Sequence, residues 1–109
     1  MLDSRDPRYV SYNTAVKQAI ELEWVYPDVA LRHGLEGKLV LAFTILRNGQ
    51  LEAVHVIRSS GFSALDQEAI RAVQTAAPFR PLPPWIGKRL DIMATFEYVD
   101  SRVKYDFAR

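Results

Sequence analysis

Two histidines and a pair of serines are the residues of this 109-residue chain with the most evident capacity for chemistry. His33 and His55 are the only histidines, and the chain has no cysteine and no His-Glu-x-x-His motif that would complete a metal site. His55 could serve as a base for Ser59 or Ser60, but the Gly-x-Ser-x-Gly elbow of a serine nucleophile is missing. Serines beside a glycine are typical of turns. We therefore predict neither a metal site nor a catalytic serine.

The acidic and glycine-containing segments do not favour catalysis either. Asp66 and Glu68 lie two residues apart in the first turn of a predicted helix, where carboxylates interact favourably with the helix dipole. Gly37-Lys38 is not part of a Gly-x-x-x-x-Gly-Lys-[Ser/Thr] phosphate-binding loop. The sequence thus predicts no catalytic residue, no metal and no cofactor, and the chain is not expected to be an enzyme.

Composition restricts the class of partner. Fourteen basic and thirteen acidic residues give a net charge of +1, which is too balanced for a protein that neutralises many nucleic-acid phosphates. The chain has no apolar run of about 18 residues, and its N-terminus lacks the apolar core of a signal peptide. The length indicates one domain. We expect either a cytosolic protein or a domain taken from a longer chain.

The segment from Gly37 to Gly61 is predicted to be a β-hairpin. Two β-rich runs flank Asn48-Gly49, the dipeptide typical of a type I′ turn, in which both central residues have positive φ. The first run is apolar on both faces, so we expect it in the middle of a sheet. The second run loses strict alternation, which predicts a bulge near Glu52-Ala53.

Two helical regions surround this hairpin. Apolar residues at three- and four-residue spacing predict a helix from Tyr9 that ends at Tyr26-Pro27, and a short helical piece from Asp28 to His33 stops at Gly34. A further helix is predicted over residues 64–77, with an apolar stripe of Leu65, Ala69, Val73 and Ala76. The proline-rich residues 78–85 should form a stiff, extended connection.

The last predicted strand runs from Leu90 to Val99 and alternates strictly. Its apolar positions face one way and its more polar positions the other, as in an antiparallel strand with one covered face. The tail, residues 100–109, also alternates and is predicted to hold a short fourth strand. Residues 1–8 form a flexible lead-in, and residues 9–99 form the domain.

The element order is α-β-β-α-β. It predicts an α+β fold, a two-layer sandwich in which two helices cover one face of a three-stranded antiparallel sheet, with a possible short fourth strand.

The ordered motifs of residues 12–99 resemble the C-terminal periplasmic domain of the TonB/TolA family of energy transducers. Each motif is weak alone, but their order along the chain is specific. They are Tyr26-Pro27 with Ala30 and Gly34; Leu35-Glu36-Gly37-Lys38 before a strand with Phe43-Thr44-Ile45; Asn48-Gly49; Val54-x-Val56-Ile57-Arg58-Ser59-Ser60-Gly61; Leu65-Asp66-x-x-Ala69-Ile70-x-Ala72-Val73; Ala77-Pro78-Phe79-x-Pro81-Leu82-Pro83; and Phe96-x-Tyr98.

The resemblance implies a larger context. Such proteins have an N-terminal inner-membrane anchor, which associates with proton-driven motor proteins, and a Pro-rich periplasmic spacer. Their C-terminal domain captures the TonB box of an outer-membrane TonB-dependent transporter and transmits force during uptake of siderophore-bound iron, cobalamin or other scarce nutrients. The chain would then be the periplasmic end domain of a Gram-negative inner-membrane protein.

Two other functions stay open. Val16, Lys17, Ala19, Ile20 and Trp24 resemble the TolA side of the family as much as the TonB side, so a TolA-like domain of a Tol-Pal system, serving envelope integrity, is the alternative. Independently of the family, the proline-rich segment could be a PxxP ligand for an SH3-like domain.

Addition of a β-strand is the expected mechanism of partner binding, because an edge strand offers unpaired N–H and C=O groups to an extended peptide. We expect Leu90–Val99 to be that edge, unless the tail or a second copy of the domain, in a homodimer, covers it. Tyr26 and Pro27 are included as possible contacts, although helix termination also explains them. The predicted partner-binding residues are Tyr26, Pro27, Leu90, Asp91, Ile92, Met93, Ala94, Thr95, Phe96, Glu97 and Tyr98.

Overall fold

The computed structural model describes the backbone of residues 7–107 and the side chains of residues 11–105. Its elements follow the order α1 (Pro7–Glu23), α2 (Asp28–Arg32), β1 (Gly37–Leu46), β2 (Leu51–Arg58), α3 (Ser63–Ala76), β3 (Arg89–Val99) and β4 (Arg102–Phe107). The α+β sandwich is confirmed, and the tail forms the fourth strand. Helix α1 begins two residues earlier than expected, and residues 1–6 of the predicted lead-in lie outside the described range.

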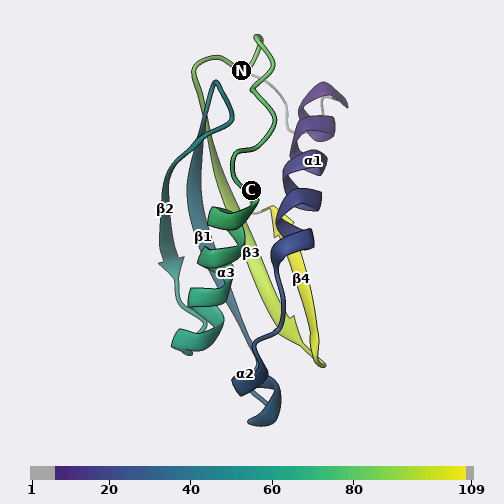
Figure 1. Ribbon diagram of the computed structural model, residues 1–109, viewed down its shortest axis with the longest axis vertical. Coiled ribbons are helices and arrows are strands. Elements are labelled where there is room, and N and C mark those ends of the chain that lie inside the picture. The colour runs from purple at the N-terminus through teal and green to yellow at the C-terminus, as the bar shows by residue number, and fades with distance from the viewer. Residues whose placement is uncertain (1–6, 108–109) are drawn as a thin grey trace.

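The four strands form one antiparallel sheet in the order β2-β1-β3-β4. Helices α1 and α3 lie side by side on one face of this sheet, and α2 lies at one end of it (Figure 1). Strand β1 is central, as its two apolar faces predicted. Of the helices in the described part of the chain, none has the length and hydropathy that a membrane crossing needs.

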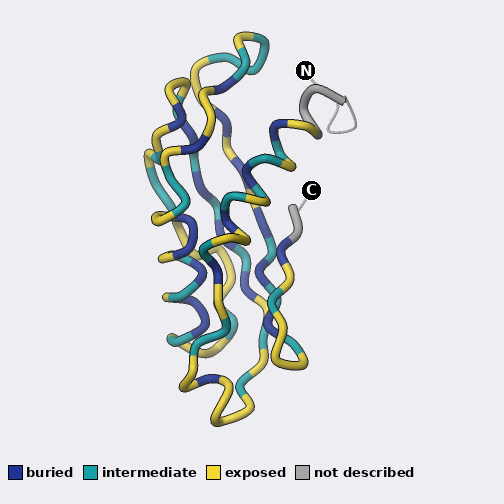
Figure 2. The backbone as a smooth tube through the Cα atoms, turned by 45° about the vertical axis from the view of Figure 1, so that its right-hand side comes forward, coloured by how far each residue is buried: buried dark blue, intermediate teal, exposed yellow. Residues whose placement is uncertain are grey.

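The core lies between the sheet and the two long helices. Buried and more exposed residues alternate along β1 and β3, as Figure 2 shows, because successive side chains of a strand point to opposite faces. The buried stripe of α1 meets the small residues of α3, which let the helix lie close to the strands. Among the described side chains, the buried apolar residues are Tyr12, Val16 and Ile20 of α1, Trp24 directly after it, and Leu65, Ala69, Ala72 and Val73 of α3.

The β1–β2 hairpin differs from its prediction. Asn48 is not among the residues with positive φ, and the N–H of Gly49 donates to the carbonyl of Leu46 over 2.8 Å. The loop is therefore three residues long, Arg47 to Gly49, with Gly49 in the left-handed region at φ +92°. The predicted bulge is confirmed, because Thr44 pairs with Ala53 and Ile45 with Leu51, which leaves Glu52 without an opposite residue.

The proline-rich segment is fixed to this hairpin loop by its backbone. The N–H of Phe79 donates to the carbonyl of Gly49, and the N–H of Leu82 donates to the carbonyl of Arg47, both over 2.8 Å. The side chains of Phe79 and Leu82 are buried. The segment therefore closes one end of the core and is not a free polyproline peptide.

Candidate functional site

The sheet has two outer sides where a peptide strand could add. One is the outer side of β2. The other is formed by β4 and by the first half of β3, because β4 pairs only with Ala94–Val99. The expectation that all of Leu90–Val99 is an edge is therefore wrong for its second half. That half lies between β1 and the tail strand, and the sequence could not show which strand would end the sheet.

The outer side of β2 is irregular. The register shifts at Glu52 and again at Ile57, since Val40 pairs with Arg58 and Leu41 with Val56. Bulges twist an edge and interrupt the regular spacing of its hydrogen-bonding groups, and proteins use them to discourage strand addition. This edge is a poor template for a long partner strand.

The first half of β3 is regular and, among the described residues, has a neighbouring strand on one side only. Arg89 to Met93 pair in unbroken register with Leu46 to Ala42 of β1. Leu90 and Ile92 point into the core, whereas Met93 is 47% exposed on the opposite face. Within the described range, the backbone groups on the outer side of this half have no strand partner, so they could pair with a second neighbour of β3.

Polar contacts fix the exposed face of this half-strand. The hydroxyl of Thr44 donates to the carboxylate of Asp91 over 2.6 Å, and Arg89 forms an ion pair with Glu52 of β2. These contacts tie β3 to its neighbour β1 and, across β1, to β2. Both contacts are made by side chains and leave the outer backbone groups of the strand unused.

Strand β4 is a short strand that pairs with β3 along its whole length and buries Tyr105. It is six residues long, and the ring of Tyr105 packs edge-to-face on Phe96 at 4.9 Å between centroids. Its turn places Asp100 and Ser101 at φ +53° and +62°, a left-handed conformation that aspartate adopts more readily than serine and glycine most readily of all. The type I′ turn thus occurs here and not at Asn48-Gly49. A short strand with such a turn is a candidate for exchange with a partner.

An open groove of about 640 Å³, called the α1–β4 groove below, is lined by residues of α1, β1, β3 and β4. Its walls carry charges of both signs, and they include Lys17, Glu21, Glu97, Lys104 and Tyr105.

The predicted partner residues fall into two groups. The apolar residues of β3 (Leu90, Ile92, Ala94, Phe96 and Tyr98) are buried against the helices, and the polar face presents Asp91, Met93, Thr95 and Glu97. Tyr26 packs on Tyr98 near the C-terminal end of β3, and Pro27 directly follows Tyr26 in the chain. The ring of Tyr26 packs edge-to-face on Tyr98 at 5.2 Å, and its hydroxyl donates to the carbonyl of Leu35. Within β3, only the polar face and the backbone can meet a partner directly, and Tyr26 and Pro27, both partly exposed, stay predicted contacts.

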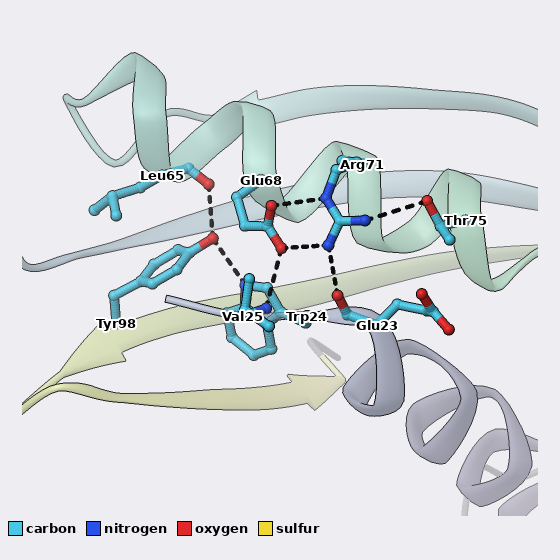
Figure 3. Close-up of polar contacts among 8 residues, drawn as sticks. All are labelled: Glu23, Trp24, Val25, Leu65, Glu68, Arg71, Thr75 and Tyr98. Atoms are coloured by element: carbon cyan, nitrogen blue, oxygen red, sulfur yellow. Dashed lines mark hydrogen bonds and ion pairs between the residues drawn. The ribbon is translucent and has the colours of Figure 1, made fainter. Parts of the chain in front are cut away.

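A polar network that the sequence did not predict joins α1, α3 and β3 (Figure 3). The Arg71 guanidinium donates to both carboxylate oxygens of Glu68, over 2.8 and 2.7 Å, and to the carbonyl of Glu23 over 2.5 Å. Trp24 donates its indole N–H to the hydroxyl of Tyr98 over 2.8 Å. The spacing of Glu68 and Arg71 identifies an ion pair within a helix. Their hydrogen-bond partners at the end of α1, however, lie more than 40 residues away in the sequence.

The tyrosines of the core stay neutral over a wide pH range. Burial raises the pKa of Tyr98 above its ordinary value of 10.0, and burial raises the pKa of Tyr12 to about 12. Burial, followed by the charges of Glu36 and Asp100, raises the pKa of Tyr26. In the described part of the chain, no three carboxylate or imidazole side chains are grouped as metal ligands.

The fold is shared with solved structures. The C-terminal domain of Helicobacter pylori TonB, residues 179–285, aligns with a TM-score of 0.70 and 25% identity, over 81% of this chain and 79% of that one. TolAIII bound to a peptide derived from the N-terminus of TolB aligns with a TM-score of 0.63 at 20% identity, over 92% of this chain and 81% of that one. The second likeness concerns the fold alone.

Sequence comparisons point to the same group of proteins. Pasteurella multocida TonB is 28% identical over 86 residues, which are 79% of this chain and 34% of that protein. Pseudomonas aeruginosa tonB2 is 43% identical over 49 residues, 45% of this chain and 18% of that protein. The chain thus spans about a third or less of the length of these relatives. The family model for the Gram-negative bacterial TonB protein C-terminal matches residues 23–99, most of the domain, and the chain belongs to that family.

Proposed function

We propose that this chain is the periplasmic end domain of a TonB-like energy transducer, without enzymatic activity, that binds the TonB box of an outer-membrane transporter by strand addition. The inner-membrane anchor and its proton-driven motor would lie outside the chain. The force that the motor exerts on the bound transporter would drive the uptake of siderophore-bound iron, cobalamin or a similar nutrient. Family membership and the one-sided, regular half of β3 support this proposal.

The partner strand would begin on the outer side of Arg89–Met93 and extend along β3 by displacing β4. Each ladder hydrogen bond contributes about 1 kcal/mol net, and ordering each peptide residue costs about as much. The complex is therefore weak and reversible. Loading several parallel hydrogen bonds along a strand nonetheless gives it resistance to a pull, and Met93, Thr95 and Glu97 would select the peptide sequence.

The test is a titration of the domain with a TonB-box peptide, followed by NMR chemical shifts. The expected perturbations lie on residues 89–98. Deletion of residues 102–109 should raise the affinity about tenfold, because binding then no longer has to displace a strand that is held by about 1.4 kcal/mol. Perturbations confined to β2 or to the α1–β4 groove, or an affinity that the deletion lowers, would contradict the proposal.

A TolA-like role is the second candidate, favoured by the fold shared with TolAIII. A peptide from the N-terminus of TolB, titrated in the same way, separates the two roles. Preferential binding of the TolB peptide would assign the domain to a Tol-Pal system. A homodimer through the same edge would appear as concentration-dependent sedimentation that the TonB-box peptide reverses.

A further inference from the structure

The C-terminal end of α1 is fastened to α3 by charged side chains. Arg71 donates to the carbonyl of Glu23 over 2.5 Å, and Glu68 accepts the backbone N–H of Val25 over 3.0 Å. The last carbonyls of a helix lack partners within the helix, and a cation near them also meets the negative end of the helix dipole. The Arg71–Glu68 pair therefore satisfies one carbonyl and one N–H at the point where α1 ends (Figure 3).

Trp24, the residue between these two contacts, is hydrogen-bonded to β3. Trp24 is 3% exposed and donates to the hydroxyl of Tyr98, which in turn donates to the carbonyl of Leu65 over 2.8 Å. The indole also packs edge-to-face on Phe96 and Tyr98, at 5.0 and 5.2 Å between centroids. We call residues 23–25 together with Glu68, Arg71 and Tyr98 the α1 clamp.

The rest of α1 is held differently. Val16 and Ile20 are buried by apolar packing, which has no preferred direction along the helix axis. The Tyr12 hydroxyl, which donates to the carbonyl of Arg80 over 2.7 Å, adds a polar contact near the other end. Hydrogen bonds are short-ranged and directional. A cluster of them therefore resists sliding of α1 along its own axis, whereas apolar contacts permit such sliding.

We infer that the α1 clamp is the point at which tension that enters the domain through α1 passes into β3. This inference rests on the proposed function, in which the pull arrives from the N-terminal side and leaves through a strand bound to β3. Tension peels the start of α1 from the sheet first. The clamp stops the peeling at Trp24 and holds α1 on the strand that carries the partner.

Single-molecule pulling in two geometries tests this role without any partner. The chain has no cysteine, so paired cysteines provide unique handles. Handles at Ser11 and Met93, both exposed, send the load from α1 to β3 across the clamp. Handles at His55 and Met93 send it across the sheet only. In the first geometry, Arg71→Ala should raise the rupture rate at a fixed load about tenfold, and Arg58→Ala, which removes an exposed arginine of β2, should leave it unchanged.

The second geometry distinguishes a positioning role from general stabilisation. There Arg71→Ala should leave the rupture rate unchanged, whereas a variant that merely weakens the fold accelerates rupture in both directions. Arg71→Lys, which keeps the charge and one donor, should restore part of the resistance, and Glu68→Gln should repeat the effect of Arg71→Ala with a smaller disturbance. Equal acceleration in both geometries, or none in the first, would overturn the inference. Because no peptide is present, these results do not depend on whether the partner site is assigned correctly.

Discussion

Trp24 and Tyr98 lie 74 residues apart in the sequence and are joined by a buried hydrogen bond of 2.8 Å from the indole N–H to the phenol oxygen. The Tyr98 hydroxyl uses its own proton to bond the carbonyl of Leu65. One hydroxyl group therefore connects the end of α1, the start of α3 and the last part of β3. This arrangement requires the neutral form of the phenol, because a phenolate has no proton for Leu65.

Replacement of Tyr98 by phenylalanine tests the contribution of this hydroxyl. The change keeps the ring but leaves the Trp24 N–H and the Leu65 carbonyl without their partner, so the free energy of unfolding should fall by about 2 kcal/mol. Urea unfolding measures it. A double-mutant cycle with Trp24→Phe isolates the coupling between the two side chains. Additive effects of the two substitutions would show that the hydrogen bond contributes little.

The same hydroxyl predicts how stability depends on pH. Burial raises the pKa of Tyr98 above its unfolded value of 10.0, so the folded state keeps a proton that the unfolded state releases. Its contribution to stability is complete below pH 10 and is lost as the pH rises above that value. Tyr12, whose pKa is about 12, acts with the same sign.

Unfolding measured from about pH 8 to about pH 11 should show a falling free energy, and Tyr98→Phe should make the fall shallower. Tyrosinate absorbance gives the ionisation of the folded state independently. A Tyr98→Phe variant whose stability falls as steeply as that of the parent would contradict the assignment.

Gly49 occupies a position where a side chain has no space. An added Cβ would collide with the carbonyl oxygen of Phe79, and the residue has a φ of +92°. Gly49→Ala should therefore lower the free energy of unfolding by more than about 2 kcal/mol. Gly61 is the matched control, because it has a φ of +94° but nothing within 4 Å of an added Cβ. Gly61→Ala should cost only the backbone strain, about 1 kcal/mol. Equal losses would mean that the contact with Phe79 relaxes freely.

Local patterns predicted the elements well because the causes of those elements are local. The alternation of β1 and β3, the apolar stripe of α3 and the left-handed Gly34 follow from side-chain spacing and backbone sterics. The bulge at Glu52 follows from the lost alternation of β2. Each of these features depends on residues within a few positions of one another.

Features that join distant segments could not be predicted in the same way. The pairing of β4 with Ala94–Val99 decides which strand ends the sheet, and the short alternation of the tail does not determine it. The contacts of Glu68 and Arg71 with the end of α1 depend on how two helices settle on the sheet. The type I′ turn at Asp100-Ser101 lacks the usual glycine, whereas Asn48-Gly49 has it and forms a longer loop.

That unfavourable turn offers a way to strengthen β4 without touching its strand. Asn-Gly is the dipeptide preferred for a type I′ turn, so Asp100→Asn combined with Ser101→Gly should raise the free energy of unfolding by about 0.5–1 kcal/mol. The hydrogen bond from the Asp100 N–H to Glu36, 2.9 Å long, uses the backbone and remains.

If a partner strand has to displace β4, this stabilised turn should weaken binding of a TonB-box peptide about two- to fivefold, as titration calorimetry would measure. The control is the same double substitution in the chain that lacks residues 102–109, where no β4 remains to be displaced and the affinity should not change. A stabilised hairpin with unaltered affinity in the longer chain would show that the peptide binds without displacing β4. Binding would then be confined to the Arg89–Met93 half of β3 or to the groove beside α1, where only side-chain substitutions on those surfaces would affect it.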